Sequence, residues 1–495
     1  MVFRMEWLLP DINFKIVSPE IILLISGLLI LILEPFLKGK KKIVLPHLSW
    51  IAVILSLIMT FRLWGLESSS FSHMVIADNF SYFFNVIFLL GTFLVILSSV
   101  NYLKKENILR GEYFSLILFS TIGMMLMASS LNLIVIFLGL EVMSVSLYIL
   151  AGFKKTDLKS NESSMKYFLI GAFASGFLLY GIALIYGVTR TVNLKELLLI
   201  FSSPGFEKPL LLFIGIGLLI VGFGFKIASV PFQMWVPDVY QGAPTPITAF
   251  ISSGPKAAGF AALLRVFIFA LGNLKPDWIV ILWVLAALTM TIGNIIAISQ
   301  TNIKRLLAYS SIAHAGYILV ALVAGGSSGI SSAMFYLLAY VFMNIGAFVV
   351  VIALGESRTN LEDYSGLGWK YPWLGVFMTI FMLSLAGFPP TAGFMAKFYV
   401  FSAAIKSGYI GLVIIAVLNS FVSVYYYLRV TVIMFMRSSS SPPEADLPLA
   451  DEIEPVSFPY LWSLALLLCT SGTLLLGIFP QNFLLLAQNS VFLIF

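Results

Sequence analysis

A succession of long apolar segments between short polar loops, from residue 19 to residue 479, most constrains what this chain can fold into. An apolar segment of about 17–25 residues can cross a bilayer as a helix, and only helices or closed barrels satisfy their own backbone in hydrocarbon. Hydrophobic residues make up 60% of the chain and charged residues 11%, with a mean hydropathy of +1.01. We therefore predict an all-α polytopic membrane protein.

The apolar segments predict about fourteen transmembrane helices. They are residues 19–36, 47–64, 80–103, 113–129, 131–152, 163–188, 209–240, 245–271, 277–299, 304–325, 328–354, 372–405, 408–436 and 458–479. Loops rich in Lys and Arg alternate with these spans, at residues 38–42, 104–110, 154–159, 304–305 and 358–370. With an even number of spans, all these loops lie on the cytoplasmic side and the N-terminus lies outside.

The seventh and twelfth spans are too long for one straight helix and carry proline near the middle. Pro231 and Pro237 interrupt the seventh span, and Pro389 and Pro390 interrupt the twelfth. Proline removes a backbone donor and clashes with the preceding turn, so each span should break into two half-helices. Five spans separate the breaks, which predicts two inverted five-helix repeats, an arrangement found in transporters.

These features predict five regions. They are N-terminal helices 1–3 (1–112), a first five-helix repeat with helices 4–8 (113–271), a second with helices 9–13 (277–436), an acidic Ser/Pro-rich loop (437–457), and a last helix with the C-terminal tail (458–495). The acidic loop has the composition of a solvated segment, and partner docking is the alternative.

Three lysines, Lys226, Lys256 and Lys397, lie inside apolar segments. A charge near the bilayer centre costs roughly 2.5–3.5 kcal/mol on insertion scales, so such residues indicate function. Glu141, in the middle of the fifth span, needs a partner on another helix, and Lys226 is the natural candidate. A change in their separation would shift the proton affinity of the lysine. The alternative is a static ion pair that holds two helices together.

Two further titratable residues, Lys166 in the sixth span and His314 in the tenth, extend this series. Several titratable groups across a bilayer, with hydroxyl residues between them, favour a water-assisted proton relay. Ammonium groups repel metal cations, so the series favours protons over sodium. Asp238 is compatible with a gate or a helix cap, and Arg265 with an ion pair or a side chain that reaches the interface.

Electron transfer within this chain is not expected. One cysteine, Cys469, cannot hold an iron–sulfur cluster, and three scattered histidines cannot ligate a pair of haems. The glycines at 215, 217, 222 and 224 lie in an apolar helix with no preceding strand, so they indicate helix packing rather than a dinucleotide site. The net charge of +6 follows from the basic loops and does not indicate nucleic acid.

Four stretches resemble the antiporter-like membrane subunits of proton-pumping NADH:quinone oxidoreductase, respiratory complex I. They are residues 225–250, 253–260, 300–317 and Ser384-Leu-Ala-Gly-Phe-Pro-Pro-Thr-Ala-Gly-Phe-Met-Ala-Lys-Phe-Tyr399. The similarity covers about residues 80–436. Tyr240-Gln-Gly-Ala-Pro-Thr-Pro246, the stretch 166–176 and Lys397 are most similar to the subunit N branch, because the subunit M branch has a glutamate at the last position.

The resemblance implies roles for single residues. Glu141 and Lys226 would form the coupled carboxylate–lysine pair, Lys256 and His314 the central relay, and Lys397 the terminal donor towards the outside. Lys166 matches an auxiliary lysine of the subunit N branch.

The resemblance also implies a function: a non-redox proton-translocating subunit, an enzyme only as part of the translocase. FMN, iron–sulfur clusters and quinone would belong to other subunits, with no cofactor or metal in this chain. The expected partners are other complex I membrane subunits, both antiporter-like and small, and the lipid of a bacterial plasma membrane; a thylakoid or other organelle membrane stays open. The alternatives are a subunit of a multisubunit Mrp-type sodium/proton antiporter and a structural scaffold whose buried charges fix helix register.

Overall fold

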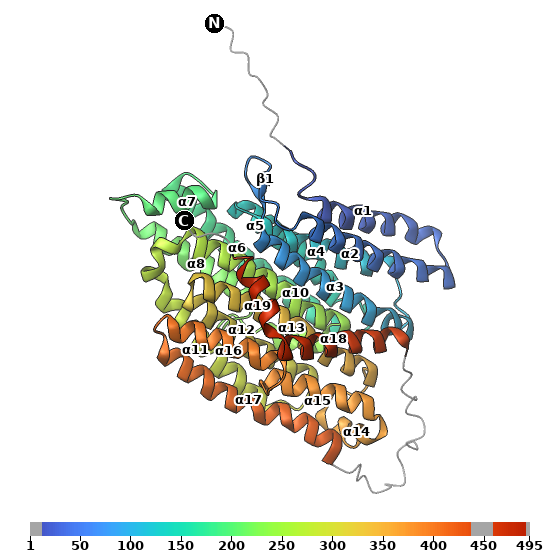
Figure 1. Ribbon diagram of the computed structural model, residues 1–495. Coiled ribbons are helices and arrows are strands. Elements are labelled where there is room, and N and C mark those ends of the chain that lie inside the picture. The colour runs from blue at the N-terminus through green and yellow to red at the C-terminus, as the bar shows by residue number, and fades with distance from the viewer. Residues whose placement is uncertain (1–11, 437–458, 492–495) are drawn as a thin grey trace.

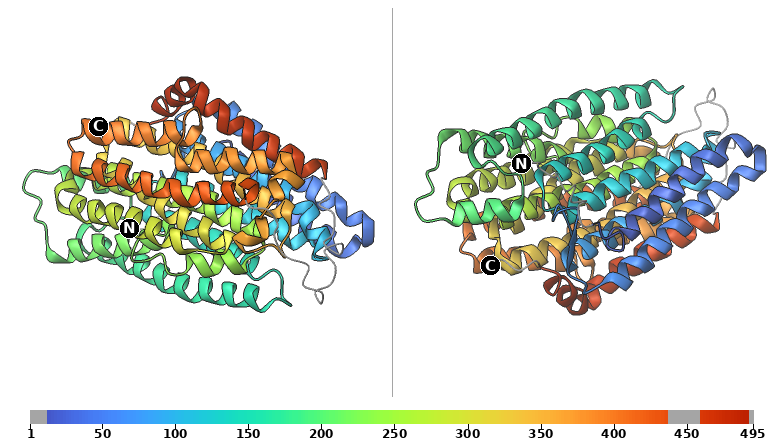
Figure 2. Two further views of the ribbon diagram at one scale, coloured as in Figure 1. Left: turned by 90° about the horizontal axis from the view of Figure 1, so that it is seen from below. Right: turned by 90° about the horizontal axis from the view of Figure 1, so that it is seen from above.

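The computed structural model describes residues 12–436 and 459–491, and its long helices lie side by side in one bundle (Figure 1). Figure 2 shows that these helices run along nearly one common direction. In the described ranges, 13 helices are long and apolar enough to cross a membrane. The predicted multi-pass helical fold is therefore confirmed, whereas the exact number of spans, the inverted repeats and the region boundaries stay predictions. The acidic loop 437–457 lies outside the described residues.

The helices follow one another with short connections. Those before the first break and just after it are α1 (Ser18–Leu33), α2 (Val44–Leu63), α3 (Asn79–Lys105), α4 (Gly111–Ser129), α5 (Leu133–Ala151), α6 (Leu158–Thr189), α7 (Leu194–Ser202), α8 (Leu210–Ile227) and α9 (Val236–Gly242). The remainder are α10 (Thr245–Leu263), α11 (Lys275–Ser299), α12 (Ile303–Ala324), α13 (Gly326–Leu354), α14 (Leu367–Lys370), α15 (Pro372–Ala386), α16 (Ala392–Lys406), α17 (Ile410–Met436), α18 (Tyr460–Ile478) and α19 (Pro480–Gln488).

Shorter elements connect the long helices. They are the 3₁₀ turns η1 (Glu34–Phe36), η2 (Gly39–Ile43), η4 (Gly272–Leu274) and η5 (Leu361–Tyr364), the π-helix η3 (Leu264–Ala270), and the antiparallel strands β1 (Ser68–Ser70) and β2 (Val75–Ala77). The hairpin and α7 are too short to give a membrane-span signal and were not predicted from the sequence.

Three helices form the centre of the bundle. The apolar windows of the α10–η3 segment, α12 and α13 are buried over 100%, 94% and 94% of their residues, against 28% in α1 and 39% in α6 and α17. Side chains on α10 and α12 are therefore enclosed by protein, whereas α1, α6 and α17 present apolar faces outward.

Both predicted breaks are present. Helix α8 ends at Ile227, where Ala228 adopts a left-handed conformation (φ 63°), and α9 begins at Val236 after the Pro231 turn. Helix α15 ends at Ala386, followed by the left-handed Gly387 (φ 92°) and the two prolines, before α16 begins. Left-handed C-caps end a helix, and the proline behind each one prevents its continuation.

The basic loops meet at one end of the bundle, which we name the inner end because positive loops face the cytoplasm. Lys42 pairs with Glu34 at 2.5 Å, and Lys154 after α5 pairs with Glu106 after α3 at 2.6 Å. The first turn of α12 lies beside the end of α13, where Lys304 Nζ is 3.8 Å from a Glu356 carboxylate oxygen. Ion pairs between loops thus close the inner end.

Candidate proton relay

Four of the predicted relay residues are almost completely buried. Lys226 on α8 and Lys256 on α10 are each 3% exposed, His314 on α12 is 1% exposed, and Lys397 on α16 is 4% exposed. A charged or polar group at such depth is costly unless it is hydrogen-bonded. The partners of each group therefore decide what it can do.

Lys226 bonds to α5, but through a serine rather than through Glu141. Its ammonium donates to Ser144 Oγ at 2.8 Å and lies 5.7 Å from the centre of the Tyr167 ring. Glu141, one turn before Ser144, is partly exposed and accepts a hydrogen bond from Ser175 of α6. Within the described chain Glu141 and Lys226 form no direct ion pair, and they interact electrostatically over a longer distance. Lys226 therefore contacts α5 at Ser144, one turn after Glu141, and not at Glu141 as expected.

Lys256 bonds to α12. Its ammonium donates to the carbonyl oxygen of Ser311 at 2.9 Å and to the hydroxyl of the same residue. The Ser311 hydroxyl also contacts the Tyr240 hydroxyl at 3.2 Å, and the ammonium lies 5.9 Å from the centre of the Tyr240 ring. Lys256 therefore points towards α12, whereas Lys226 points towards α5 from the opposite side of the α8–α10 contact.

Three aromatic rings connect the two lysines, one from α6 and two from the second half of the first broken helix. The Tyr167 ring beside Lys226 stacks on Trp235 at 4.5 Å between centroids with an angle of 8°. Trp235 meets Tyr240 edge to face at 6.5 Å, and the Tyr240 ring faces Lys256. All three rings are buried, at 0–2% exposure. We name these three residues the aromatic bridge.

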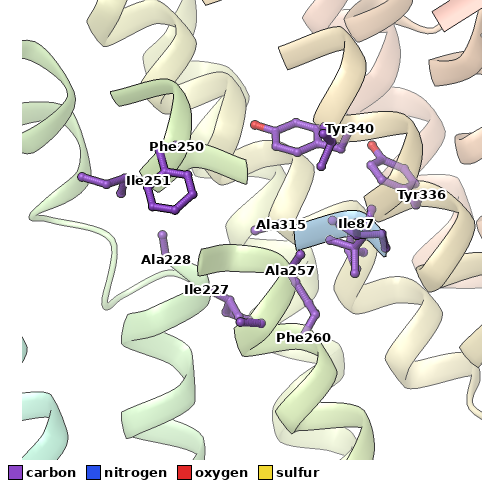
Figure 3. Close-up of a cluster of buried hydrophobic side chains, with 14 of the residues drawn as sticks. Ile87, Ile227, Ala228, Phe250, Ile251, Ala257, Phe260, Ala315, Tyr336 and Tyr340 are labelled. Carbon is purple, nitrogen blue, oxygen red and sulfur yellow. The ribbon is translucent and has the colours of Figure 1, made fainter. Parts of the chain in front are cut away.

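Apolar side chains fill the rest of the space between the two lysines. Figure 3 shows a buried cluster contributed by α3, α8, α10, α12 and α13, which includes Ile227 next to Lys226 and Ala257 next to Lys256. A β-carbon at Gly259, one turn beyond Lys256, would meet Ile227 at 3.0 Å and the Lys226 stem at 3.6 Å. The absence of a side chain at Gly259 therefore lets α8 approach α10 closely.

His314 lies between Lys256 and Lys397 and contacts two tyrosines. Its Nδ1 is 2.6 Å from the Tyr336 hydroxyl and its Nε2 is 3.0 Å from the Tyr427 hydroxyl. Both lysines lie within electrostatic range of the imidazole. Both ring nitrogens therefore contact groups that can donate or accept a proton.

Lys397 lies at the second break. Its ammonium donates to the carbonyl oxygens of Leu385 and Ala386, at 3.2 and 2.7 Å, and to Ser420 Oγ at 2.9 Å. These carbonyls end the half-helix α15, where the helix dipole favours a cation. A cavity of about 390 Å³ adjoins the lysine and is walled by the exposed ring of Phe421, so this end of the relay is open towards the side of the bundle.

Lys166 stands apart from the buried groups. Its side chain is 41% exposed and pairs with Glu162 and Asp238, at 2.7 Å each, and Asp238 also pairs with Arg305 at 2.8 Å. Partial burial raises the pKa of Asp238, but the hydrogen bonds from Lys166 and Arg305 outweigh this and lower it. The structure therefore connects Lys166 to a surface ion-pair network that joins α6, α9 and α12.

Arg265 is an ion-pairing residue. The guanidinium, 1% exposed, donates two hydrogen bonds to Asp78 at 2.7 and 2.8 Å and one to the Ala128 carbonyl at 2.9 Å. Of the two alternatives that the sequence left open, pairing is correct.

The serines and tyrosines that contact the lysines and the histidine were not predicted from the sequence. The sequence pattern that could have revealed the serines is their helical spacing from the titratable residues. Ser144 follows Glu141 by one turn, and Ser311 precedes His314 by one turn. Within the described residues no group of three His, Cys, Asp or Glu side chains could hold a metal ion.

Comparison with known proteins places this geometry in a family. Residues 130–423 match the family described as NADH:quinone oxidoreductase/Mrp antiporter, TM. A chain of the Mrp complex from Dietzia sp. DQ12-45-1b shares the fold, with a TM-score of 0.84, 21% identity and 97% coverage of both chains. A chain of respiratory complex I from Thermus thermophilus with bound aureothin has a TM-score of 0.80 at 34% identity, covering 95% of this chain and 99% of that one. The fold and the buried lysines thus define an antiporter-like membrane subunit.

The curated relatives narrow this class. NADH-quinone oxidoreductase subunit N of Trichlorobacter lovleyi is 50% identical over 497 residues, covering 100% of both chains. Subunit N 1 of Solibacter usitatus is 44% identical over 475 residues, covering 95% of this chain and 96% of the relative. The chain belongs to the NADH-quinone oxidoreductase subunit N family.

Proposed function

We propose that the chain is a non-redox, proton-translocating subunit in the membrane arm of an NADH:quinone oxidoreductase in a bacterial plasma membrane. The observation that carries the proposal is the set of three buried lysines and a buried histidine in the central and broken helices of a subunit N family member. Such groups are costly in a membrane and are retained where protons or ions move. Quinone reduction, FMN and iron–sulfur clusters belong to partner subunits in this proposal.

The relay starts at Glu141 on the side of the bundle. Its carboxylate is partly exposed, and the neighbouring Leu138 and Val142 face outward at 53% and 42% exposure. A partner membrane subunit on this face, antiporter-like or small, can therefore act on Glu141 by charge or by contact. Any change at Glu141 reaches Lys226 electrostatically across one turn of α5, which is effective because the interior has a low dielectric constant.

Lys256 and His314 form the centre of the relay and Lys397 its outer end. A proton on Lys256 has the Ser311 hydroxyl as its first acceptor, and His314 exchanges protons with the Tyr336 and Tyr427 hydroxyls. Lys397 takes up the proton beside the half-helix α15 and is the group from which it is released towards the outside. The relay carries protons rather than sodium because ammonium groups repel metal cations.

The first test alters the pair that receives the signal. Glu141→Ala and Lys226→Ala in the assembled complex should each lower quinone reduction and proton pumping by roughly tenfold or more, because positioned proton-transfer groups contribute large factors. Glu141→Asp should retain much of both activities, since it keeps the carboxylate. Full activity in both alanine variants would remove the role assigned to the pair.

The second test separates proton release from assembly. Lys397→Ala should block pumping while the complex still assembles, and Lys406→Ala on the same helix is the matched control because Lys406 is exposed at the outer end of α16. A Lys397→Ala complex that fails to assemble would instead favour the scaffold alternative.

The third test addresses the partners. A tagged chain purified from native membranes should bring with it a large assembly that contains flavin and iron–sulfur clusters and oxidises NADH with quinone. Recovery with small membrane proteins alone, and without redox activity, would favour the Mrp-type antiporter.

A further inference from the structure

A buried ion pair marks the inner end of α10, below Lys256. Lys304, in the first turn of α12, is 3% exposed, and its ammonium donates to the Ala243 carbonyl at 2.8 Å. Glu356 follows α13, and its carboxylate lies 3.8 Å from the Lys304 ammonium with 26% of the side chain exposed. The carboxylate therefore has one side towards the inner aqueous phase and the other towards the protein.

Glu356 also holds the first residue of α10. One carboxylate oxygen accepts hydrogen bonds from the Thr245 amide, at 3.2 Å, and from the Thr245 hydroxyl. The Tyr102 hydroxyl reaches the same carboxylate. Burial raises the pKa of Glu356, but the charge of Lys304 and the hydrogen bonds from Thr245 outweigh it, so the net shift is downward. The group is ionised at neutral pH and gives up a proton readily.

A stripe of polar side chains leads from this carboxylate to Lys256. Thr245, Thr248, Ser252 and Lys256 are spaced by three, four and four residues, so they share one face of α10 and span roughly 16 Å at a 1.5 Å rise per residue. Thr248 and Ser252 have no exposed surface. We name these four residues the α10 polar stripe.

A residue of α13 adds a further polar group to the stripe. Asn344, which has no exposed surface, donates from its amide to Ser252 Oγ at 2.5 Å. Its buried Oδ1 has no hydrogen-bond partner among the described residues. A buried amide oxygen without a protein partner is satisfied by water, and water completes a chain of hydroxyl groups for proton transfer.

The alternative role for Glu356 is purely structural, because a carboxylate at a helix N-terminus caps the free amide groups. Capping requires only an oxygen that accepts hydrogen bonds, which the amide of glutamine also supplies. Capping also does not require the Thr245 hydroxyl, since the amide of Thr245 reaches Glu356 by itself. The two roles are therefore separable by substitution.

We propose that Glu356 takes up protons from the inner aqueous phase and passes them through the Thr245 hydroxyl and the α10 polar stripe to Lys256. The proposal rests on the proposed function, because it supplies the protons that the relay moves. In each cycle a proton from the inner aqueous phase protonates the carboxylate, the carboxyl group passes it to the hydroxyl chain and returns to its ionised form, and the neutral amine of Lys256 gains it after giving its own proton to the relay. Lys304 keeps the carboxylate ionised between transfers.

Several other titratable groups surround Glu356 from the elements packed against it. They are Lys304 of α12, Tyr102 of α3, Glu106 just after α3, Lys154 and Asp157 of the loop after α5, and Tyr364 of η5. Lys154 and Glu106 pair with each other at 2.6 Å, so Lys304 is the cation that acts directly on the carboxylate.

The test compares Glu356→Gln with the parent complex across pH. The glutamine keeps the cap but cannot carry a proton, so NADH-driven pumping and quinone reduction should fall by roughly tenfold. The loss should grow as the pH rises, because uptake then depends on the falling proton concentration. Glu356→Asp should restore most of the activity. Glu362→Gln is the matched control, since Glu362 is an exposed acid in the same loop.

A second pair of variants tests the path without breaking the ion pair. Thr245→Val removes the hydroxyl and keeps the shape and the backbone amide, and should slow both activities several-fold, whereas Thr245→Ser should not. If the Glu356→Gln complex fails to assemble, the comparison of Thr245→Val with Thr245→Ser tests the proposal in its place. Parent rates at every pH in Glu356→Gln and Thr245→Val, with pumping abolished in Lys256→Ala, would overturn this proposal and leave the proposed function intact. Full pumping in Lys256→Ala would overturn the proposed function itself.

Discussion

The Asp78–Arg265 ion pair allows a quantitative prediction, because the hydrogen bonds that the Asp78 carboxylate accepts from the helix and from Arg265 are separate. Asp78 caps α3, where its carboxylate accepts from the Ser81 amide at 2.9 Å, and it also accepts two hydrogen bonds from Arg265 in the π-helix η3. The pair thus joins the outer end of α3 to the helix that carries Lys256. Asp78→Asn removes the negative charge and one acceptor, yet asparagine still caps the helix.

The expected loss follows from the burial of the arginine. Breaking a buried ion pair by removing one partner costs about 3–5 kcal/mol, because the remaining charge is uncompensated. Arg265 keeps its bond to the Ala128 carbonyl and its place 4.5 Å from the centre of the Phe80 ring, so we expect about 3 kcal/mol, near the lower limit. Asp78→Ala should cost about 1 kcal/mol more, the usual value of a lost N-cap.

The assay is the thermal unfolding midpoint of the purified complex, together with its abundance in membranes. Glu207→Ala, an exposed acid in the loop between α7 and α8, is the control and should have no effect. Adding Arg265→Leu to Asp78→Asn should recover most of the loss, since the charge that Asp78 balanced is then gone. An Asp78→Asn complex as stable as the parent would refute the assignment of Asp78 as the counter-charge of Arg265.

Three further predictions concern the relay and its surroundings. Gly259→Val should lower the thermal midpoint by an amount equivalent to about 1–3 kcal/mol, because its side chain would overlap Ile227, and an unchanged midpoint would contradict the close α8–α10 contact. Tyr427→Phe, which removes the partner of His314 Nε2, should slow pumping several-fold without impairing assembly; parent pumping rates would count against His314 as a relay group. Burial raises the pKa of Asp238, but hydrogen bonds outweigh burial and lower this pKa below its usual 3.8. The ionised Asp238 therefore contributes its full stabilisation above pH 3.8, and the protein loses this stabilisation as the pH falls further. Asp238→Asn should flatten the fall of the thermal midpoint in acid, and parent-like acid sensitivity would argue against this ion pair.

The membrane fold and both breaks could be predicted because their causes are local. An apolar run of helical length and a proline within it act on their own backbone, whatever surrounds them. The burial of Lys256 and Lys397 could be predicted in the same way, from the apolar residues on either side. The β hairpin and α7 were missed because they are too short to leave a span signal and their structure depends on the helices that they connect.

Side-chain partners could not be predicted, because they depend on the rotation of each helix about its axis. Glu141 and Lys226 are both in apolar segments, yet α5 turns Ser144 rather than Glu141 towards α8. Lys166 also lies in an apolar stretch, but α6 is a peripheral helix and turns this lysine to the surface. A charge within a predicted span is therefore evidence of function only when its helix is also central.

The separation of Lys226 from Lys256 indicates how the two halves of the relay are coupled. Their ammonium groups bond to α5 and to α12 respectively, and within the described residues no hydrogen bond joins Ser144 to Ser311. The apolar side chains in the region between the two lysines do not pass protons on, but they strengthen electrostatic interaction because they screen the charges little. The aromatic bridge crosses this region, and its central ring, Trp235, ends the interrupted segment between α8 and α9. Tyr167 belongs to α6, whereas Trp235 and Tyr240 belong to the break, so a shift of that segment would move the ring beside Lys256 and the ring stacked on Tyr167 beside Lys226. In the proposed relay the first break would thus couple the two charges.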